Sequence, residues 1–289
     1  MYAFFGLLLV GVMVYAGVIE IPHSVVQEPE NPPATGIALQ LPVQFTVKDA
    51  LTGTAVNGTL YIYDNDTLLE AVSIVDGKGT SADAYDSGTV LTLFFVGTNY
   101  VAPPQSWTVP YARVESQEIY YCSVKAYAMA GEADVTLAAL DKLGNQFATE
   151  DTYSNVTKED NKFEGYVKIT VAAGKALMSY FDKVEDENDD VLLVFELGDT
   201  LATLSSNDLQ LQRIEYGGKA YYIAKLQDII ATKDDPAIKQ VGFTIFYGGT
   251  NPLPVTIKLV TATDYNAFLS SLTVDSDGFE DAIATFYVQ

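Results

Sequence analysis

The first apolar stretch of the chain is continuous and shows no period. Residues 2–19 carry no charge, so both faces of a helix over this stretch are apolar. At about 1.5 Å per residue such a helix spans roughly 27 Å, close to the hydrocarbon thickness of a bilayer. The pattern predicts a transmembrane-type anchor helix over residues 1–21. Its side chains expected to contact lipid are Phe4, Phe5, Leu7, Leu8, Leu9, Val10, Val12 and Val14.

The flanks of this stretch predict a retained anchor. A secretory signal begins with Lys or Arg, and pilin-type precursors carry a basic leader; neither precedes the apolar run here. Acidic residues follow it, at Glu20, Glu28 and Glu30, and no Lys or Arg flanks it on the cytoplasmic side. We therefore expect a membrane-anchored protein whose C-terminal body lies outside.

The pattern changes after the helix. Residues 22–42 hold five of the eleven prolines and predict an extended, semi-rigid stalk. Residues 43–102 alternate apolar and polar positions, as at Val43, Phe45 and Val47, and include the hairpin signal Asp76-Gly77. They predict one small β-domain. Residues 103–110 are again rich in proline and predict a linker, with Trp107 expected to fill the junction between two domains.

Residues 111–289 predict a larger β-domain. Eight apolar or alternating runs recur in it: 118–125, 133–140, 163–171, 191–197, 208–216, 219–226, 241–247 and 253–260. This count is typical of a jelly roll or a large sandwich. Helical spacing predicts two short helices, at 174–184 and 264–272. The expected fold class is therefore all-β, with the N-terminal helix, a small sandwich, and a larger jelly-roll-like or sandwich domain that includes the two helices.

One motif supports the small domain. The stretch "VKDALTGTAVNGTLYIYD" contains V-x-D-x-x-T-G-x-x-V-x-G, matched by Val47, Asp49, Thr52, Gly53, Val56 and Gly58. In this motif residues 43–102 resemble the first strands of carboxypeptidase-regulatory-like and CnaB-type immunoglobulin-like domains. The resemblance implies an immunoglobulin-like sandwich module and does not point to a particular activity. A CnaB-type crosslink needs an inward lysine near the first strand, and Lys48 alternates with Val47, so we expect it to point outward and predict no crosslink.

Composition excludes several functions. The net charge is −22 and the only arginines are Arg113 and Arg213, so the chain lacks the basic stripe of a nucleic-acid binder. The single histidine, His23, lies in the predicted stalk, and the single cysteine, Cys122, lies in a strand-like run. Histidine-dependent nucleophilic catalysis and a zinc site are therefore disfavoured. We predict a protein that is not an enzyme and has no cofactor.

Two further kinds of site follow from short patterns. Asp275 and Asp277, before Gly278, form a fragment of a calcium loop, and the alternative is a capped turn. Three N-x-[ST] sequons, at Asn57, Asn65 and Asn155, fall on predicted loops and are candidate glycosylation sites.

The overall plan resembles membrane-anchored structural proteins of virions or cell surfaces. The favoured hypothesis is a non-enzymatic virion component, such as a membrane-anchored capsid, penton or spike protein. The alternative is a cellular surface filament, adhesin or envelope-layer subunit, and a lesser one is an anchored hydrolase or carbohydrate-binding module. The expected partners are membrane lipid or copies of the N-terminal helix, together with other structural subunits in a homo-oligomer or larger assembly.

Overall fold

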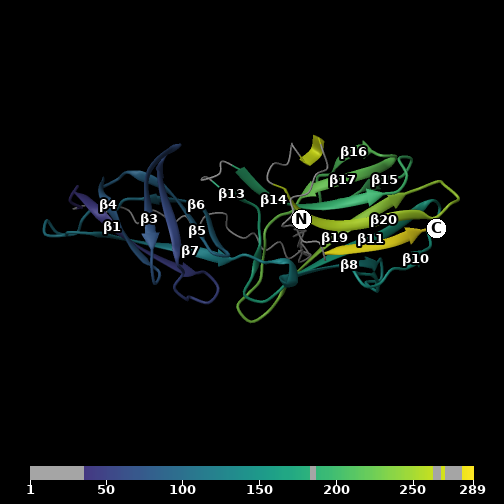
Figure 1. Cartoon of the computed structure of the whole chain (residues 1–289), viewed down its shortest axis with the longest axis horizontal. Helices are drawn as coiled ribbons and strands as arrows, with labels where there is room; N and C mark the ends of the chain where they lie inside the picture. Colours follow the sequence, from purple (N-terminus) through teal and green to yellow (C-terminus); the bar gives the residue numbers. More distant parts are fainter. Residues whose placement is uncertain (1–35, 183–186, 263–267, 271–281) are drawn as a thin grey trace, which may run out of the picture.

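The computed structural model describes residues 36–182, 187–262, 268–270 and 282–289, and almost all of the regular secondary structure in these ranges is β-strand. They form two bodies that lie end to end along the longest axis (Figure 1). The strands of the first body are β1 Gln40–Asp49, β2 Gly58–Asp64, β3 Thr67–Ile74, β4 Lys78–Asp86, β5 Val90–Gly97, β6 Tyr100–Thr108 and β7 Tyr120–Ala128.

The first body is a seven-stranded sheet in the order β3-β2-β5-β6-β7-β1-β4. Its two edge strands, β3 and β4, are joined by the turn at Asp76 and Gly77, so the sheet folds back around one core. That core contains Val43, Phe45 and Val47 of β1, all fully buried. Alternation along β1 therefore gives one inward face, as the sequence predicted.

The first and last strands of this body are parallel neighbours. β1 pairs with β7 from Val43↔Tyr120 to Asp49↔Ala126 in one unbroken register. β6 and β7 pair only at Tyr100↔Ala128 and Val101↔Tyr127, so the sheet bends between them. The result is a sandwich-like body with β4, β1 and β7 on one side.

The second body consists mainly of two facing sheets, in the orders β10-β21-β20-β14-β17-β16 and β15-β19-β11-β8-β9. Its elements are the 3-10 turn η1 Glu132–Asp134 and the strands β8 Val135–Asp141, β9 Gln146–Ala148, β10 Asn155–Val156, β11 Lys162–Val171, β12 Ala176–Leu177, β13 Tyr180–Asp182, β14 Glu187–Leu197, β15 Thr203–Ser205, β16 Gln212–Tyr216, β17 Lys219–Lys225, β18 Ile229–Ile230, β19 Ala237–Phe246, β20 Leu253–Ala262 and β21 Ile283–Val288.

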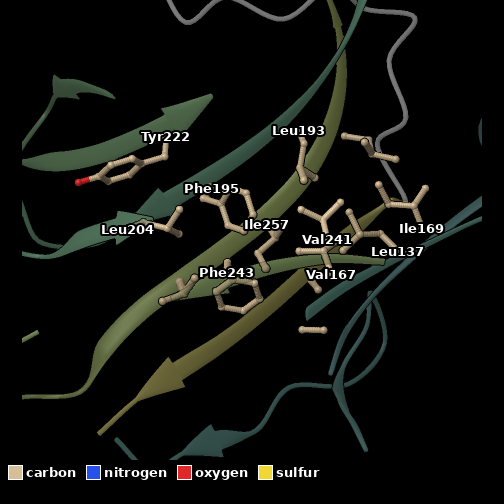
Figure 2. Close-up of a cluster of buried hydrophobic side chains, with 14 of the residues drawn as sticks. Leu137, Val167, Ile169, Leu193, Phe195, Leu204, Tyr222, Val241, Phe243 and Ile257 are labelled. Carbon is tan, nitrogen blue, oxygen red and sulfur yellow. The ribbon is translucent and has the colours of Figure 1, made fainter. Parts of the chain in front are cut away.

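Apolar side chains from both sheets fill the space between them. Figure 2 shows Val167 and Val241 from one sheet close to Phe195 and Ile257 from the other. β14 is buried on its other face too, where Leu192 and Val194 join a second cluster with Phe268. This explains why β14 reads as a continuous apolar run in the sequence.

The expected fold class is corrected in its helices: the described chain is nearly all β in its regular structure, and the segment expected as a helix at 174–184 contains the strands β12 and β13. In the described ranges no helix has the length and apolar character needed to cross a membrane. The anchor expected at 1–21, with its lipid-facing residues from Phe4 to Val14, lies outside the described residues, as does the stalk up to residue 35. The first strand overlaps the end of the stalk expected over 22–42, because β1 begins at Gln40.

The two short helices have different outcomes. In the segment 174–184, Ala176 and Leu177 form β12 and pair with β18, more than fifty residues away. A long-range strand partner therefore overrides the helical spacing of the apolar residues. In the segment 264–272 the structure describes residues 268–270, which are helical, with Phe268 buried.

The expected linker at 103–110 is a strand as far as Thr108. The register of β6 against β5 shifts between Leu93↔Gln105 and Phe95↔Ala102, so Pro103 and Pro104 fall in a bulge. Proline lacks the N–H needed for a regular ladder and is tolerated at such a position. β7, expected in the larger domain, belongs to the first body through its pairing with β1.

Candidate functional site

Most of the sequence-predicted site residues lie outside the structure or on its surface. The calcium candidates Asp275 and Asp277 are outside the described residues. Within the described ranges, no group of three or more His, Cys, Asp or Glu side chains is placed to hold a metal ion. Asn57, Asn65 and Asn155 are all exposed, so they are accessible to modification, and glycosylation stays a prediction.

The immunoglobulin-like motif is a turn with structural roles. The Asp49 carboxylate is buried and accepts hydrogen bonds from the Leu51 N–H at 2.9 Å and the Thr52 hydroxyl at 2.7 Å. Gly53 follows with φ +75°, a conformation that favours glycine. A Cβ on Gly58 would lie 2.3 Å from the Val96 carbonyl oxygen. The motif therefore shapes the turn that leads from β1 to β2 and lets β2 approach β5 closely, which is a structural role.

Two other carboxylates are used in the same structural way. Glu70 of β3 accepts a hydrogen bond from the Ala82 N–H at 2.6 Å and one from the Tyr85 hydroxyl at 3.1 Å, which links β3 to β4. Burial and the Glu70 charge raise the pKa of Tyr85. In the second body, buried Asp190 lies 2.6 Å from the Lys225 ammonium.

The junction between the bodies is short and hydrogen-bonded. The backbone N–H of Met129 donates to the Asn99 carbonyl, and that of Ala130 donates to the Ala176 carbonyl, at 2.9 and 2.8 Å. Around them lies a small apolar cluster, composed of Val101, Ala176 and Met178 with Tyr127, Met129 and Ile230 packed against it. Trp107, expected here, instead packs edge-on against Phe45 inside the first body, with ring centroids 6.3 Å apart.

The path of the chain gives the molecule two distinct ends. The chain enters the first body at the end remote from the junction, where Ile37 pairs with Ala112 and the buried Tyr120 hydroxyl lies 2.7 Å from Ser87 Oγ. β7 leaves this body at the junction. In the second body β8 begins at the junction, and β21 ends at the far tip, where the C-terminus lies (Figure 1).

Cys122 is predicted to be chemically inert in the native protein. Its side chain is buried on the inner face of β7, and burial raises the pKa of the thiol to about 12. Since the thiolate is the reactive form, iodoacetamide at pH 8 should leave the folded chain unlabelled and should label it completely in denaturant. Mass spectrometry measures the adduct. Rapid labelling of the folded chain would contradict the buried position of Cys122.

Comparisons with known proteins give only distant similarity. No family model and no curated protein matches the chain. Among solved structures it is similar to the major pilin subunit of Bacillus cereus, at 10% identity and a TM-score of 0.29, over 87% of this chain and 68% of that one. It is also similar to the full-length major pilin SpaD from Corynebacterium diphtheriae, at 9% identity and a TM-score of 0.29, over 87% and 64%.

A third solved structure, the Corynebacterium diphtheriae major pilin SpaA, is similar at 12% identity and a TM-score of 0.30, over 76% of this chain and 62% of that one. The chain spans less than two thirds of the length of the two Corynebacterium pilins. Scores this low transfer neither a fold nor a role to this chain.

Proposed function

We propose that this chain is a non-enzymatic structural subunit of a cell-surface assembly: a filament subunit, an adhesin or an envelope-layer component. The observation that carries the proposal is the in-line path of the chain. It enters one sandwich at its outer end, crosses a hydrogen-bonded junction, and ends at the far tip of the second sandwich. Two sandwiches in line act as a spacer, which transmits tension between the molecules attached at its two ends.

The uses of the buried polar groups support a structural role. Asp49 caps a turn and Asp190 is paired with Lys225. A glycosidase needs two carboxyl groups on either side of a substrate, and these two acids lie in different bodies. The anchored hydrolase is therefore not proposed.

The virion role that the sequence favoured is set aside. It depended on a membrane helix at residues 1–21, which lie outside the described residues, and no comparison supports it. The cell-surface alternative requires only domains that project from a surface and assemble, so we retain this hypothesis.

Surface labelling tests the proposal. Antibodies raised against residues 36–289 should label intact cells that make the chain, and immunogold electron microscopy should place the label on extended surface structures. Permeabilised cells provide the control for total protein. Labelling that requires permeabilisation would contradict the proposal.

A further inference from the structure

Three lysines gather on one outer sheet face of the first body. Lys48 of β1 and Lys125 of β7 are direct register partners. Lys78 of β4 pairs with Thr46, two residues before Lys48 on β1. All three side chains are exposed, and they stand on the face opposite to the core residues of the same strands. We call these three residues the lysine face.

Within the described residues the lysine face has no salt-bridge partner. No ion pair joins Lys48, Lys78 or Lys125 to a carboxylate in the part of the chain that the structure describes. The residues between them on the same face, Thr46 and Ser123, are uncharged. Asp49 follows Lys48 directly in sequence, but its buried carboxylate accepts hydrogen bonds from the Leu51 N–H and the Thr52 hydroxyl. Asp76, on the turn before Lys78, forms no salt bridge with the three lysines in the described residues.

This arrangement is unfavourable for an isolated subunit. Like charges that lie directly opposite each other on neighbouring strands destabilise a sheet, and Lys48 and Lys125 form such a pair. The chain has 16 basic residues against 38 acidic ones, so an acidic neighbour for each lysine was readily available. Several lysines of the second body do have one, as Lys175 has in Asp134 at 3.2 Å.

We propose that the lysine face binds carboxylates on a second copy of this chain. Local charge complementarity favours this occupant: the lysine face is basic, whereas acidic residues outnumber basic ones 38 to 16 on every neighbouring copy. Copies with a net charge of −22 repel each other at long range, so a contact between them needs such a basic patch. The lysine face and the acidic surface that it binds are different patches, so the contact is heterologous and can extend into an open array of copies. This inference rests on the proposed role as an assembly subunit and names one of its contacts.

Self-association of the full chain tests the inference. The variant Lys48→Glu/Lys78→Glu/Lys125→Glu should self-associate at least about tenfold more weakly than the wild type in sedimentation velocity at low ionic strength. The control, Lys142→Glu/Lys219→Glu/Lys233→Glu, makes the same change in net charge on exposed lysines of the second body. It also breaks the ion pairs of Lys142 with Glu159 and of Lys219 with Glu196, so its thermal unfolding is compared with that of the wild type. It should associate like the wild type.

A second variant separates binding from folding. Lys48→Gln/Lys78→Gln/Lys125→Gln removes the three charges without adding new ones, and its thermal unfolding should match or exceed that of the wild type because the like-charge pair is lost. It should also associate more weakly. Undiminished association of either lysine-face variant, or an equal loss in the control, would overturn the inference.

Mixing a lysine-face variant with the wild type tests whether the contact joins two different patches. A lysine-face variant still offers its acidic surface, so small amounts of it should shorten assemblies of the wild type by ending their growth. If the variant is not incorporated and the assemblies keep their length, the claim of a heterologous contact is wrong. If only the lysine-face contact is wrong, antibodies should still label intact cells. If the chain is absent from the cell surface, the proposed function is wrong.

Discussion

Phe243→Ala is expected to lower the free energy of unfolding of the second body by about 3–5 kcal/mol. Phe243 of β19 is buried between the two sheets, where its ring contacts Phe163, Phe195 and Phe286 at centroid distances of 5.5–6.4 Å. Figure 2 labels Phe243 and Phe195 in this cluster. Phe195 and Phe286 come from the opposite sheet. Removing the ring therefore loses apolar burial and leaves a cavity at the point where the sheets meet.

The same strand supplies the control. Phe246, three residues further along β19, is 44% exposed, so Phe246→Ala should change the free energy of unfolding by no more than about 0.5 kcal/mol. Urea unfolding followed by far-UV circular dichroism measures both variants. Fluorescence of the single tryptophan, Trp107, reports the first body separately. Equal losses for the two variants would contradict the assigned core.

Alternation along the chain predicted the strands well because it reports burial directly. The structure has a strand in each of the eight runs expected between residues 118 and 260, and Val43, Phe45 and Val47 point inward as predicted. Lys48 points outward, as its place next to Val47 required. These features depend on residues that are adjacent in the sequence, so a local sequence pattern is enough to predict them.

Features that depend on distant partners were missed. The apolar spacing of residues 174–184 fits a helix, and only the pairing of Ala176 and Leu177 with Ile229 and Ile230 makes it a strand. Pro103 and Pro104 indicated a linker because their bulge is defined by β5. β7 was placed in the wrong body because its partner, β1, is about eighty residues earlier in the chain.

The lysine face was missed for the same reason. Lys48, Lys78 and Lys125 are far apart in sequence, and each alone is an ordinary exposed lysine. Only the register of β1 with β4 and β7 brings them together. A signal existed in the sequence for two of them, since Lys48 follows inward-facing Val47 and Lys125 follows inward-facing Val124 on predicted strands, but strand order was needed to use it.

The central claim is that this molecule transmits tension along its length, and the pairing of β1 with β7 predicts how. The chain enters β1 at the outer end and leaves β7 at the junction, and the two strands are parallel. Tension therefore slides one strand along the other and loads their evenly spaced hydrogen bonds together. Force applied to the two strands at the same end instead opens these bonds one after another.

Single-molecule force spectroscopy on the full chain can compare the two directions. Handles at Ala38→Cys and Gly131→Cys load β1 and β7 in shear, whereas handles at Ala38→Cys and Ser116→Cys peel them apart from one end. All three positions are exposed, and buried Cys122 does not compete for the handles. We expect a rupture force roughly twofold higher or more in shear than in peeling. Equal forces in the two directions would contradict the claim.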